Sequence, residues 1–295
     1  MTIPFAGETA ALGAALIWAM ATMIYARTGS RAPAVFLNLV KGSIAVGMLA
    51  LTIAVLGDAV PTLSTSQWLW LAGSGVVGIS IGDSAYFSAI KRIGPSQTLL
   101  VESLAPPLTG VLALCFLHEA IGLWAWAGIF LTMTGVLWVV TEHRPQGRLS
   151  LPGLGFAALA ALCQAAGMVM SRQVMVSTPI TPLWAALVRL AAASLVLWAV
   201  LPLFRPEVLH RRTWQSMGSA RTWGLFTLAV FLGTFLGIWL QQASLKLTSA
   251  AIAQTLISVS PLFALGLARL MGQKISRRSL IGSVVTLIGI ALFFR

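Results

Sequence analysis

The organisation of the chain can be inferred from one stretch, GISIGDSAYFSAIKRIGPSQTLLVESLAP at residues 78–106, and from its counterpart, GTFLGIWLQQASLKLTSAAIAQTLISVSP at residues 233–261. The counterpart lies at a constant offset of 155 residues and keeps the same small and helix-breaking residues. The matched pairs are Gly78 with Gly233, Gly82 with Gly237, Lys91 with Lys246, and Pro106 with Pro261. Self-similarity at a fixed offset predicts two homologous units.

The repeat extends beyond these stretches in both directions. After one deletion the offset becomes 154, and the pairs are Glu119 with Gln273, Ile121 with Ile275, Gly128 with Gly282, and Gly135 with Gly289. Upstream, Lys41 falls near Arg189. We therefore predict a first unit at residues 1–143 and a second unit at residues 153–295, joined by a polar linker at residues 144–152.

The composition places both units in a membrane. Of 295 residues, 58% are hydrophobic and 9% are charged, against about 25% charged residues in an average soluble domain. The mean hydropathy is +0.91. Ten apolar runs have membrane-spanning length, at 8–27, 33–56, 67–90, 95–117, 122–141, 153–172, 181–203, 222–245, 249–271 and 279–294. The predicted fold is an all-α polytopic membrane protein with ten transmembrane helices, five in each unit.

An odd number of spans per unit requires the second unit to enter the membrane upside down relative to the first. The basic residues agree, because 13 of the 19 lie in loops on one side. These are Arg27, Arg31, Lys91, Arg92, Arg144, Arg148, Arg205, Arg211, Arg212, Arg221, Lys274, Arg277 and Arg278, whereas the opposite side holds Arg172, Lys246 and Arg295. By the positive-inside rule we expect an inverted repeat in a bacterial inner (plasma) membrane, with both termini in the periplasm.

Three ionisable side chains of the first unit lie well inside predicted spans: Lys41, Asp83 and Glu102. Their distances along the chain from Pro33, Lys91 and Pro95 place all three about 10–12 Å from the same membrane face at 1.5 Å per residue. We expect them to meet in one layer. Lys41 can neutralise a carboxylate as a link between helices, any of the three can contact a substrate or gate its passage, or Lys41 can extend its amine to the interface.

Arg189 occupies the Lys41 position in the second unit, but Ile238 and Ile257 stand where Asp83 and Glu102 do in the first. It therefore has no intramembrane acid in its own unit. Its partners could be backbone carbonyls, an anionic group of a substrate, or nearby amides. The amides in question are Gln164, Gln241, Gln242 and Gln254. This asymmetry predicts a polar interior whose two ends differ in chemistry.

Prolines and glycines inside the spans give two further expectations. Pro106 and Pro261 each remove a backbone hydrogen bond, and interruptions at matching positions of two inverted units are typical of a transport site, with a static bend for packing as the alternative. Gly78 and Gly82 have the spacing at which membrane helices approach closely, and their counterparts in the second unit repeat it. We interpret these glycines as packing surfaces.

The remaining signals point away from catalysis, metal binding and nucleic acid. Residues 73–78 match G-x-G-x-x-G and residues 78–82 match G-x-S-x-G, but neither match follows a predicted strand. The histidines lie at or beyond span ends, and Cys115 and Cys163 show no disulfide or zinc pattern. We expect no cofactor, no metal and no catalytic residue. The net charge of +12 is explained by the loops rather than by nucleic acid.

Together these features resemble the EamA-type members of the drug/metabolite transporter superfamily, which have ten helices as two inverted five-helix repeats. The resemblance is carried by the basic residues of spans two and seven and by the series Pro106, Glu119, Gly128 and Gly135, echoed by Pro261, Gln273, Gly282 and Gly289. Within that family the chain is similar to the YddG-type aromatic amino-acid exporters. This similarity implies a central cavity lined mainly by spans one, three, four, six, eight and nine. The implied lining residues are Trp18, Asp83, Tyr86, Glu102, Gln164, Met168, Trp239, Gln242, Gln254 and Ser258.

We therefore expect a non-enzymatic inner-membrane exporter of aromatic and other amino acids that works by alternating access around a midplane cavity. In this hypothesis Pro106 and Pro261 allow helix bending, while charge pairs form or break among Lys41, Asp83, Glu102 and Arg189. Export of other metabolites or of cationic drugs is the alternative within the same class. A membrane-embedded enzyme on lipid-soluble substrates and a passive channel are alternatives from other classes. The expected partners are small-molecule amino acids and the lipid bilayer, and the chain is expected to be a monomer or a weak homo-oligomer.

Overall fold

The computed structural model describes residues 4–28, 34–142, 150–206, 210–215, 217–272 and 275–294, without the side chains of residues 26–28, 34, 35, 95 and 96. Throughout this part of the chain the secondary structure is helical, with no strand. Nine segments within it are long and apolar enough to cross a membrane: Ala6–Tyr25, Phe36–Leu56, Gln97–Leu117, Leu123–Val140, Leu151–Ser177, Pro182–Phe204, Ala220–Leu247, Ala250–Leu270 and Arg277–Phe294. The expectation of an all-helical polytopic membrane protein is confirmed.

The helices follow one another with short connections. The first half of the chain forms α1 (Ala6–Thr28), α2 (Ala34–Leu56), α3 (Thr65–Gly75), the π-helix η1 (Val76–Ile81), α4 (Gly82–Ile93), α5 (Pro95–Glu102), α6 (Ala105–Leu117) and α7 (Leu123–Val140). The second half forms α8 (Leu151–Ser177), α9 (Pro182–Phe204), α10 (Arg211–Gln215), α11 (Ala220–Val230), the π-helix η3 (Phe231–Leu236), α12 (Gly237–Leu247), α13 (Ala250–Ile257), α14 (Ser260–Leu270), α15 (Arg277–Ala291) and the 3₁₀ turn η4 (Leu292–Phe294).

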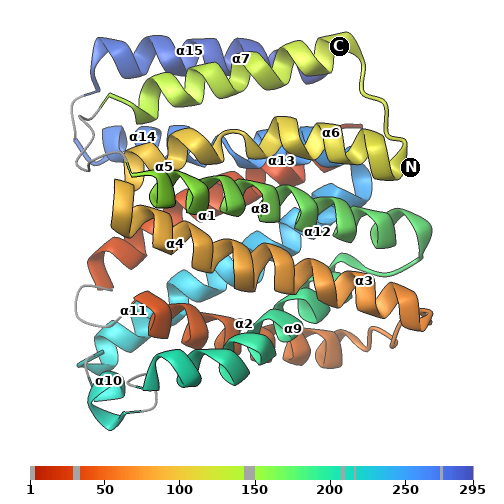
Figure 1. Cartoon of the computed structure of the whole chain (residues 1–295), viewed down its shortest axis with the longest axis vertical. Helices are drawn as coiled ribbons and strands as arrows, with labels where there is room; N and C mark the ends of the chain where they lie inside the picture. The colour runs from red at the N-terminus through yellow and green to blue at the C-terminus, as the bar shows by residue number, and fades with distance from the viewer. Residues whose placement is uncertain are drawn as a thin grey trace.

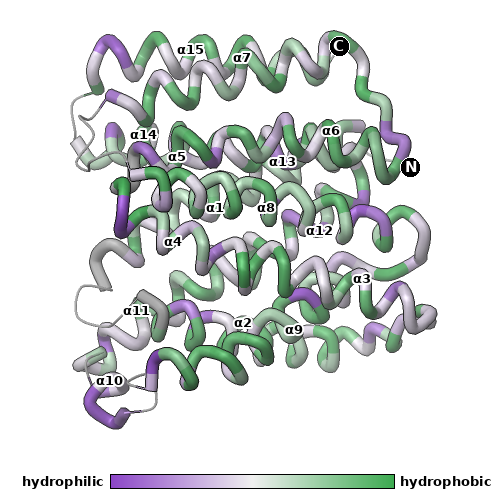
Figure 2. The backbone as a smooth tube through the Cα atoms, viewed as in Figure 1, coloured by the Kyte–Doolittle hydropathy of each residue, from purple (hydrophilic) through white to green (hydrophobic). Residues whose placement is uncertain are grey.

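The helices lie side by side in a bundle, with α7 and α15 along one edge and α2 and α9 along the other (Figure 1). Figure 2 shows hydrophilic segments mainly near the two ends of the helices and in α10, with largely hydrophobic backbone between them. Five of the basic loop residues, Arg31, Arg144, Arg148, Lys274 and Arg295, lie outside the described residues, as do Gln273 and most of the linker at 144–152.

The span expected at 67–90 corresponds to α3, η1 and α4, which continue without a break from Thr65 to Ile93. This stretch is not among the nine apolar segments, because Ser80, Asp83 and Ser84 make its second half polar. The equivalent stretch of α11, η3 and α12 does qualify and carries Ile238 in place of Asp83. The tenth crossing and the inverted arrangement of the two units therefore stay predictions.

Two kinds of helix interruption occur at the same repeat offset. The π-helices η1 and η3 begin at Val76 and Phe231, 155 residues apart. The breaks between α5 and α6 at residues 103–104 and between α13 and α14 at residues 258–259 are also 155 residues apart. Pro106 and Pro261 lie in the first turn of α6 and α14, where a missing N–H costs no hydrogen bond. The prolines therefore begin new helices rather than bend continuous ones.

Glycines bring α7 and α15 into direct backbone contact. A Cβ atom on Gly135 would collide with Thr286, and a Cβ atom on Gly289 would lie 2.5 Å from the backbone nitrogen of Thr132. The contact is reciprocal, because Thr286 and Gly289 are the 154-residue counterparts of Thr132 and Gly135. Gly135 and Gly289 were recognised from the sequence only as a repeat pair, and the structure shows that they form a close helix contact of the kind that glycine permits.

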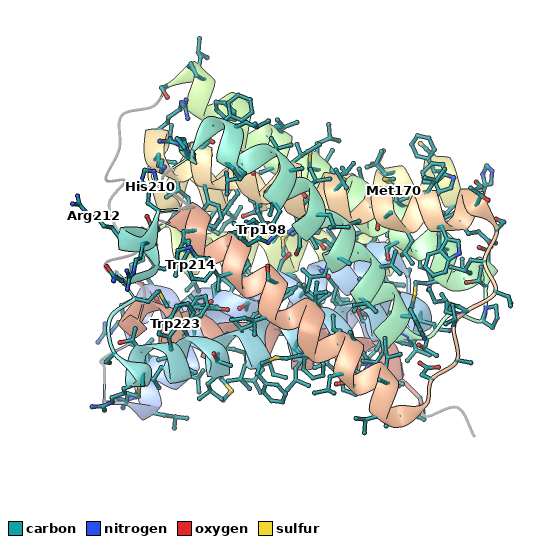
Figure 3. The ribbon with its side chains drawn as sticks, turned by 90° about the horizontal axis from the view of Figure 1, so that it is seen from below. Met170, Trp198, His210, Arg212, Trp214 and Trp223 are labelled. Atoms are coloured by element: carbon teal, nitrogen blue, oxygen red, sulfur yellow. The ribbon has the colours of Figure 1, made fainter. Side chains whose placement is uncertain are left out.

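An aromatic cluster fixes α10 to the rest of the bundle. Trp214 of α10 stacks on Trp223 of α11 with ring centroids 6.4 Å apart, and it meets the edge of Phe36 of α2 at 5.0 Å (Figure 3). Nearby, Trp198 of α9 donates a hydrogen bond from its Nε1 to Ser43 Oγ of α2 at 2.9 Å. The long connection between α9 and α11 is therefore anchored to the helices at one end of the bundle.

The α7–α15 contact predicts a specific instability. Gly135→Leu should destabilise the protein by at least about 1–3 kcal/mol, because the new side chain has no space beside Thr286. The measurement is the temperature at which the purified protein loses its monodisperse peak in size-exclusion chromatography. Gly47→Leu is the control, since no atom lies within 4 Å of a Cβ atom at Gly47. Equal stability of the two variants would contradict the close contact between α7 and α15 at Gly135.

Candidate functional site

A cavity of about 610 Å³ lies within the bundle and is lined by residues from both halves of the chain. Ten of the residues expected in the site line it: Trp18, Lys41, Asp83, Tyr86, Glu102, Gln164, Arg189, Gln254, Ser258 and Pro261. A volume in the range of about 300–1,000 Å³ is typical of small-molecule sites. Within the described residues, no group of three His, Cys, Asp or Glu side chains is arranged to hold a metal ion.

The cavity lies in the half of the bundle nearer the basic loops. On α7 its lining residues, Met133, Val136, Leu137 and Val140, belong to the part of the helix that leads to Thr141. On α5 and α14 they are Leu99, Glu102, Ser260, Pro261 and Ala264. No residue from the connections 57–64, 118–122 or 178–181 at the other end contributes to the lining.

The three intramembrane charges of the first half meet at this cavity, as their depths led us to expect. Lys41 Nζ and Asp83 Oδ2 lie 3.8 Å apart and link α2 to α4. Both side chains keep 27% of their surface exposed, so water-sized molecules can reach this ion pair. Glu102, at the end of α5, interacts electrostatically with Asp83 and Tyr86 but forms no ion pair within the described part of the chain.

Arg189 of α9 is 2% exposed and points toward α8 and η1. Its NH1 group donates a hydrogen bond to the carbonyl oxygen of Gly167 at 3.0 Å, so the structure supplies a backbone carbonyl, one of the expected kinds of partner. Its buried Nε has no hydrogen-bond partner among the described residues. The backbone of α9 is held close to α3 here, because a Cβ atom on Gly75 would collide with the Arg189 carbonyl group.

Trp18 is positioned by the second π-helix. Its Nε1 donates a hydrogen bond to the carbonyl oxygen of Gly233 at 2.5 Å. Gly237 leaves space for the indole, since a Cβ atom there would collide with Trp18 Nε1. Wide π-helical turns occur mostly as single insertions in α-helices, frequently at functional sites. The small residues of η3 and α12 thus serve both close packing and the placement of an aromatic ring in the cavity wall.

Four residues expected in the site do not line this cavity. Met168 is fully buried in a core formed with residues of α1, α7 and α13, and Trp239 packs against a second core with its ring 6.4 Å from Phe235. Gln242 is fully buried and its Oε1 accepts a hydrogen bond from Ser171 Oγ at 2.6 Å. Pro106 is buried in the first turn of α6. Their side chains are used in contacts between helices, which explains their position outside the cavity.

The cavity also contains residues not expected there. The polar ones are Thr22, Ser103, Thr234, Gln241 and Ser260. Thr22 lies one turn after Trp18 on the same helical face, and that spacing could have identified it. The helices α2, α7 and α9 contribute to the wall in addition to the spans implied by the family resemblance. The apolar residues of α7 gave no such signal, because they have the composition of a lipid-facing surface.

The opposite end of the bundle is joined by polar side chains from both halves. Arg172 donates from Nε to Glu119 Oε1 at 2.6 Å and from NH1 to the Leu245 carbonyl oxygen, and the Ala250 amide donates to Glu119 Oε2 at 3.3 Å. Further links at this end are Thr248 to Glu8, Thr181 to Asp58, and Lys246 to the Ile180 carbonyl oxygen. We call this set the acidic-end network.

Comparisons with known proteins agree with this architecture. The "Uncharacterized transporter YvbV" of Bacillus subtilis (strain 168) is 28% identical over 145 residues, which is 48% of this chain and 46% of that relative. The chain therefore matches less than half the length of that relative. A solved structure described as "Crystal structure of protein" has a TM-score of 0.81 at 18% identity and covers 97% of this chain and 96% of the other, a likeness of fold.

The family comparison covers nearly the whole chain. The model of the EamA-like transporter family matches twice, at residues 5–141 and 151–295. The names of the family and of the relative indicate a membrane transporter rather than an enzyme. A multi-pass membrane protein with a small-molecule substrate follows from this assignment together with the apolar helices. The chain belongs to the EamA-like transporter family.

Proposed function

We propose that the protein exports amino acids, aromatic ones included, across a bacterial inner membrane, in the manner of the YddG-type exporters that its sequence resembles. The observation that carries this proposal is the composition of the cavity wall. Trp18 and Tyr86 offer aromatic surface, and Arg189 and Glu102 offer charges of opposite sign in the same space. An aromatic amino acid presents a ring, a carboxylate and an ammonium group, and each has a complementary group in this wall.

The proposed mechanism is alternating access between two inverted five-helix units with ten crossings in total. Its support comes from features that occur twice at the repeat offset, namely the π-helices and the breaks before Pro106 and Pro261. The contacts between halves are reciprocal as well, because α1 packs against α12 while α8 packs against α4. Interrupted helices beside a cavity supply the places where one unit can tilt against the other.

The positions of the cavity and of the acidic-end network favour a state that is open toward the cytoplasm. The cavity lies nearer the basic loops, and the network joins the halves at the other end. Export then requires the network to separate on the periplasmic side after substrate binds. Both marked ends of the chain lie on the side of the bundle opposite α10 (Figure 1), which agrees with termini in the periplasm.

Organic cations are the second candidate substrates, because Glu102 is a carboxylate in the cavity wall without an ion-pair partner in the described residues. Asp83 is a weaker argument for cations, since Lys41 already compensates its charge. A transporter of cationic drugs would use Glu102 and leave Arg189 as an unfavourable neighbour for its substrate.

Transport by purified protein tests the proposal directly. Proteoliposomes should show saturable counterflow of labelled phenylalanine and tryptophan, measured with and without a pH gradient, and little flux of tetraphenylphosphonium. Trp18→Ala should lower phenylalanine transport by about tenfold, because a ring contact of about 1.4 kcal/mol is lost from the wall. Trp70→Ala is the matched control, since Trp70 is 48% exposed on α3 and outside the cavity.

Other results of this assay would assign the protein a different substrate or a different mode of transport. Flux of tetraphenylphosphonium without flux of amino acids would assign the protein to cation export. Flux that never saturates would indicate a channel. Absence of any amino-acid flux in an active preparation would reject the proposed substrate.

The acidic-end network predicts a gate. Arg172→Gln should weaken the closed end by about 1–3 kcal/mol, because Glu119 loses its ionic partner at a largely buried position. With Cys115 and Cys163 replaced by serine, spin labels at Phe116→Cys and Leu247→Cys should then report a broader and longer distance distribution. Arg278→Gln, which removes hydrogen bonds to Trp138 and Thr141 at the opposite end, should leave this distribution unchanged. An unchanged distribution in Arg172→Gln would show that the network does not hold this end closed.

Orientation can be tested by cysteine labelling in intact cells. With Cys115 and Cys163 replaced by serine, Val60→Cys should react with a membrane-impermeant maleimide from outside, because Val60 is 68% exposed in the connection between α2 and α3. Gln215→Cys on the exposed α10 should react only after permeabilisation. The reverse pattern would place the termini in the cytoplasm.

A further inference from the structure

Arg189 has bonding capacity that the protein leaves unused. A guanidinium carries five N–H donors and stays protonated in proteins. Here NH1 donates to the Gly167 carbonyl oxygen, while the buried Nε donates to no group. The two ion pairs found among the described residues, Lys41 with Asp83 and Arg172 with Glu119, both exclude Arg189. A charge at membrane depth normally has a counter-charge. Among the described residues, Arg189 forms an ion pair with none.

Arg189 lines the cavity although only 2% of its surface is exposed. Arg189 belongs to the cavity wall together with Gly78 of η1. A Cβ atom on Gly78 would lie only 3.5 Å from Arg189 NH2, so a larger residue at this position would place its side chain against the guanidinium. The contact between Gly75 and the Arg189 carbonyl group holds the start of the side chain in place. The backbone of Arg189 is thus held in place, and its guanidinium lies between the cavity and the helices behind it.

The other unpaired charge of the wall has the opposite sign. Four ionisable groups of these two signs line the cavity, and Lys41 and Asp83 compensate each other. Within the described residues this leaves one cation, Arg189, and one anion, Glu102, without an ion-pair partner. They lie on different helices, α9 and α5, and both helices pack against α8. The cavity therefore presents a separated pair of charges to its contents.

We propose that Arg189 is the carboxylate subsite of the cavity and that Glu102 receives the ammonium group, so that the substrates are zwitterionic α-amino acids. This rests on the proposed function, because it states how the same cavity holds and orients its substrate. A carboxylate can accept two parallel hydrogen bonds from one guanidinium, which an ammonium side chain cannot supply in that geometry. The substrate then provides the counter-charge that the second half of the chain lacks.

Analogues that each lack one group test this assignment in the wild-type protein without any substitution. Phenylalaninamide and phenethylamine lack the carboxylate, and 3-phenylpropionate lacks the amine. In competition with labelled phenylalanine in proteoliposomes, each analogue should bind at least about tenfold more weakly than phenylalanine. Equal inhibition by phenylalanine and phenylalaninamide would overturn the carboxylate subsite, even if phenylalanine transport itself leaves the proposed function standing.

Substitutions at Arg189 test whether this residue is responsible for the preference for phenylalanine over phenylalaninamide. Arg189→Gln should raise the KM for phenylalanine by about tenfold with a smaller change in kcat, and it should make phenylalanine and phenylalaninamide nearly equivalent. Arg189→Lys should keep part of the discrimination, because the charge remains but the paired donors do not. Arg269→Gln is the matched control, since Arg269 is exposed on α14 and outside the cavity wall. A general packing defect would alter transport without removing the preference for a carboxylate.

The two proposals can fail separately. If Arg189→Gln keeps the full preference for phenylalanine over its amide, the subsite is wrong and amino-acid export is untouched. If the wild type transports no amino acid, the proposal of amino-acid export is wrong. The carboxylate subsite is then tested separately, by whether 3-phenylpropionate raises the thermal stability of the protein. Stabilisation of the wild type that Arg189→Gln loses supports a carboxylate site at Arg189, and equal stabilisation of both, or of neither, overturns it.

Discussion

The hydrocarbon interior of a bilayer offers no hydrogen-bond partner, so every polar group of this chain at membrane depth must be satisfied by the protein or by a molecule that it binds. The hydroxyl groups show the simplest solution. Thr109 and Thr255 donate to carbonyl oxygens one turn earlier in their own helices, at 2.8 and 2.7 Å. Charged groups have no such local solution, because each needs a counter-charge from another helix. They are therefore found where helices from different parts of the chain meet, at the cavity and at the acidic-end network.

Close backbone contact determines where those meeting points lie. Gly75 against the Arg189 carbonyl group, Gly237 against Trp18, and Gly135 against Thr286 are positions where a single added carbon atom would overlap a neighbour. In lipid, such packing replaces the hydrophobic effect as the force that associates helices. The same contacts that hold the bundle together thus hold Arg189 and Trp18 at the cavity wall.

The sequence allowed prediction of those features that a single residue type imposes. Glycine and proline mark backbone constraints, so the repeat pair Pro106 and Pro261 indicated where helices are interrupted, although the prolines begin new helices instead of bending continuous ones. The pair Gly135 and Gly289 indicated the repeat, and the structure added the helix contact. The high cost of a buried charge identified Lys41, Asp83, Glu102 and Arg189, and all four line the cavity. The orientation of neutral residues could not be predicted in this way. Gln241 lines the cavity whereas the adjacent Gln242 bonds to Ser171. Successive residues on a helix differ by about 100° in direction, and which face met the cavity depended on tertiary packing.

The repeat preserves the backbone and changes the charges, and this difference gives the cavity a direction. Lys41 has Asp83 as its partner, whereas the second half, which carries Arg189, has Ile238 and Ile257 at the positions of the two acids. An acid at position 238 would give Arg189 a partner and would leave Glu102 as the unpaired charge of the wall. With isoleucine there, one base and one acid of the wall, on helices α9 and α5, have no ion-pair partner among the described residues. In the proposed mechanism, two halves with similar backbones tilt against each other, while their unequal side chains admit a polar molecule in one orientation. Under that proposal, the similarity of the backbones serves the movement, and the difference in charge serves the selection of the substrate.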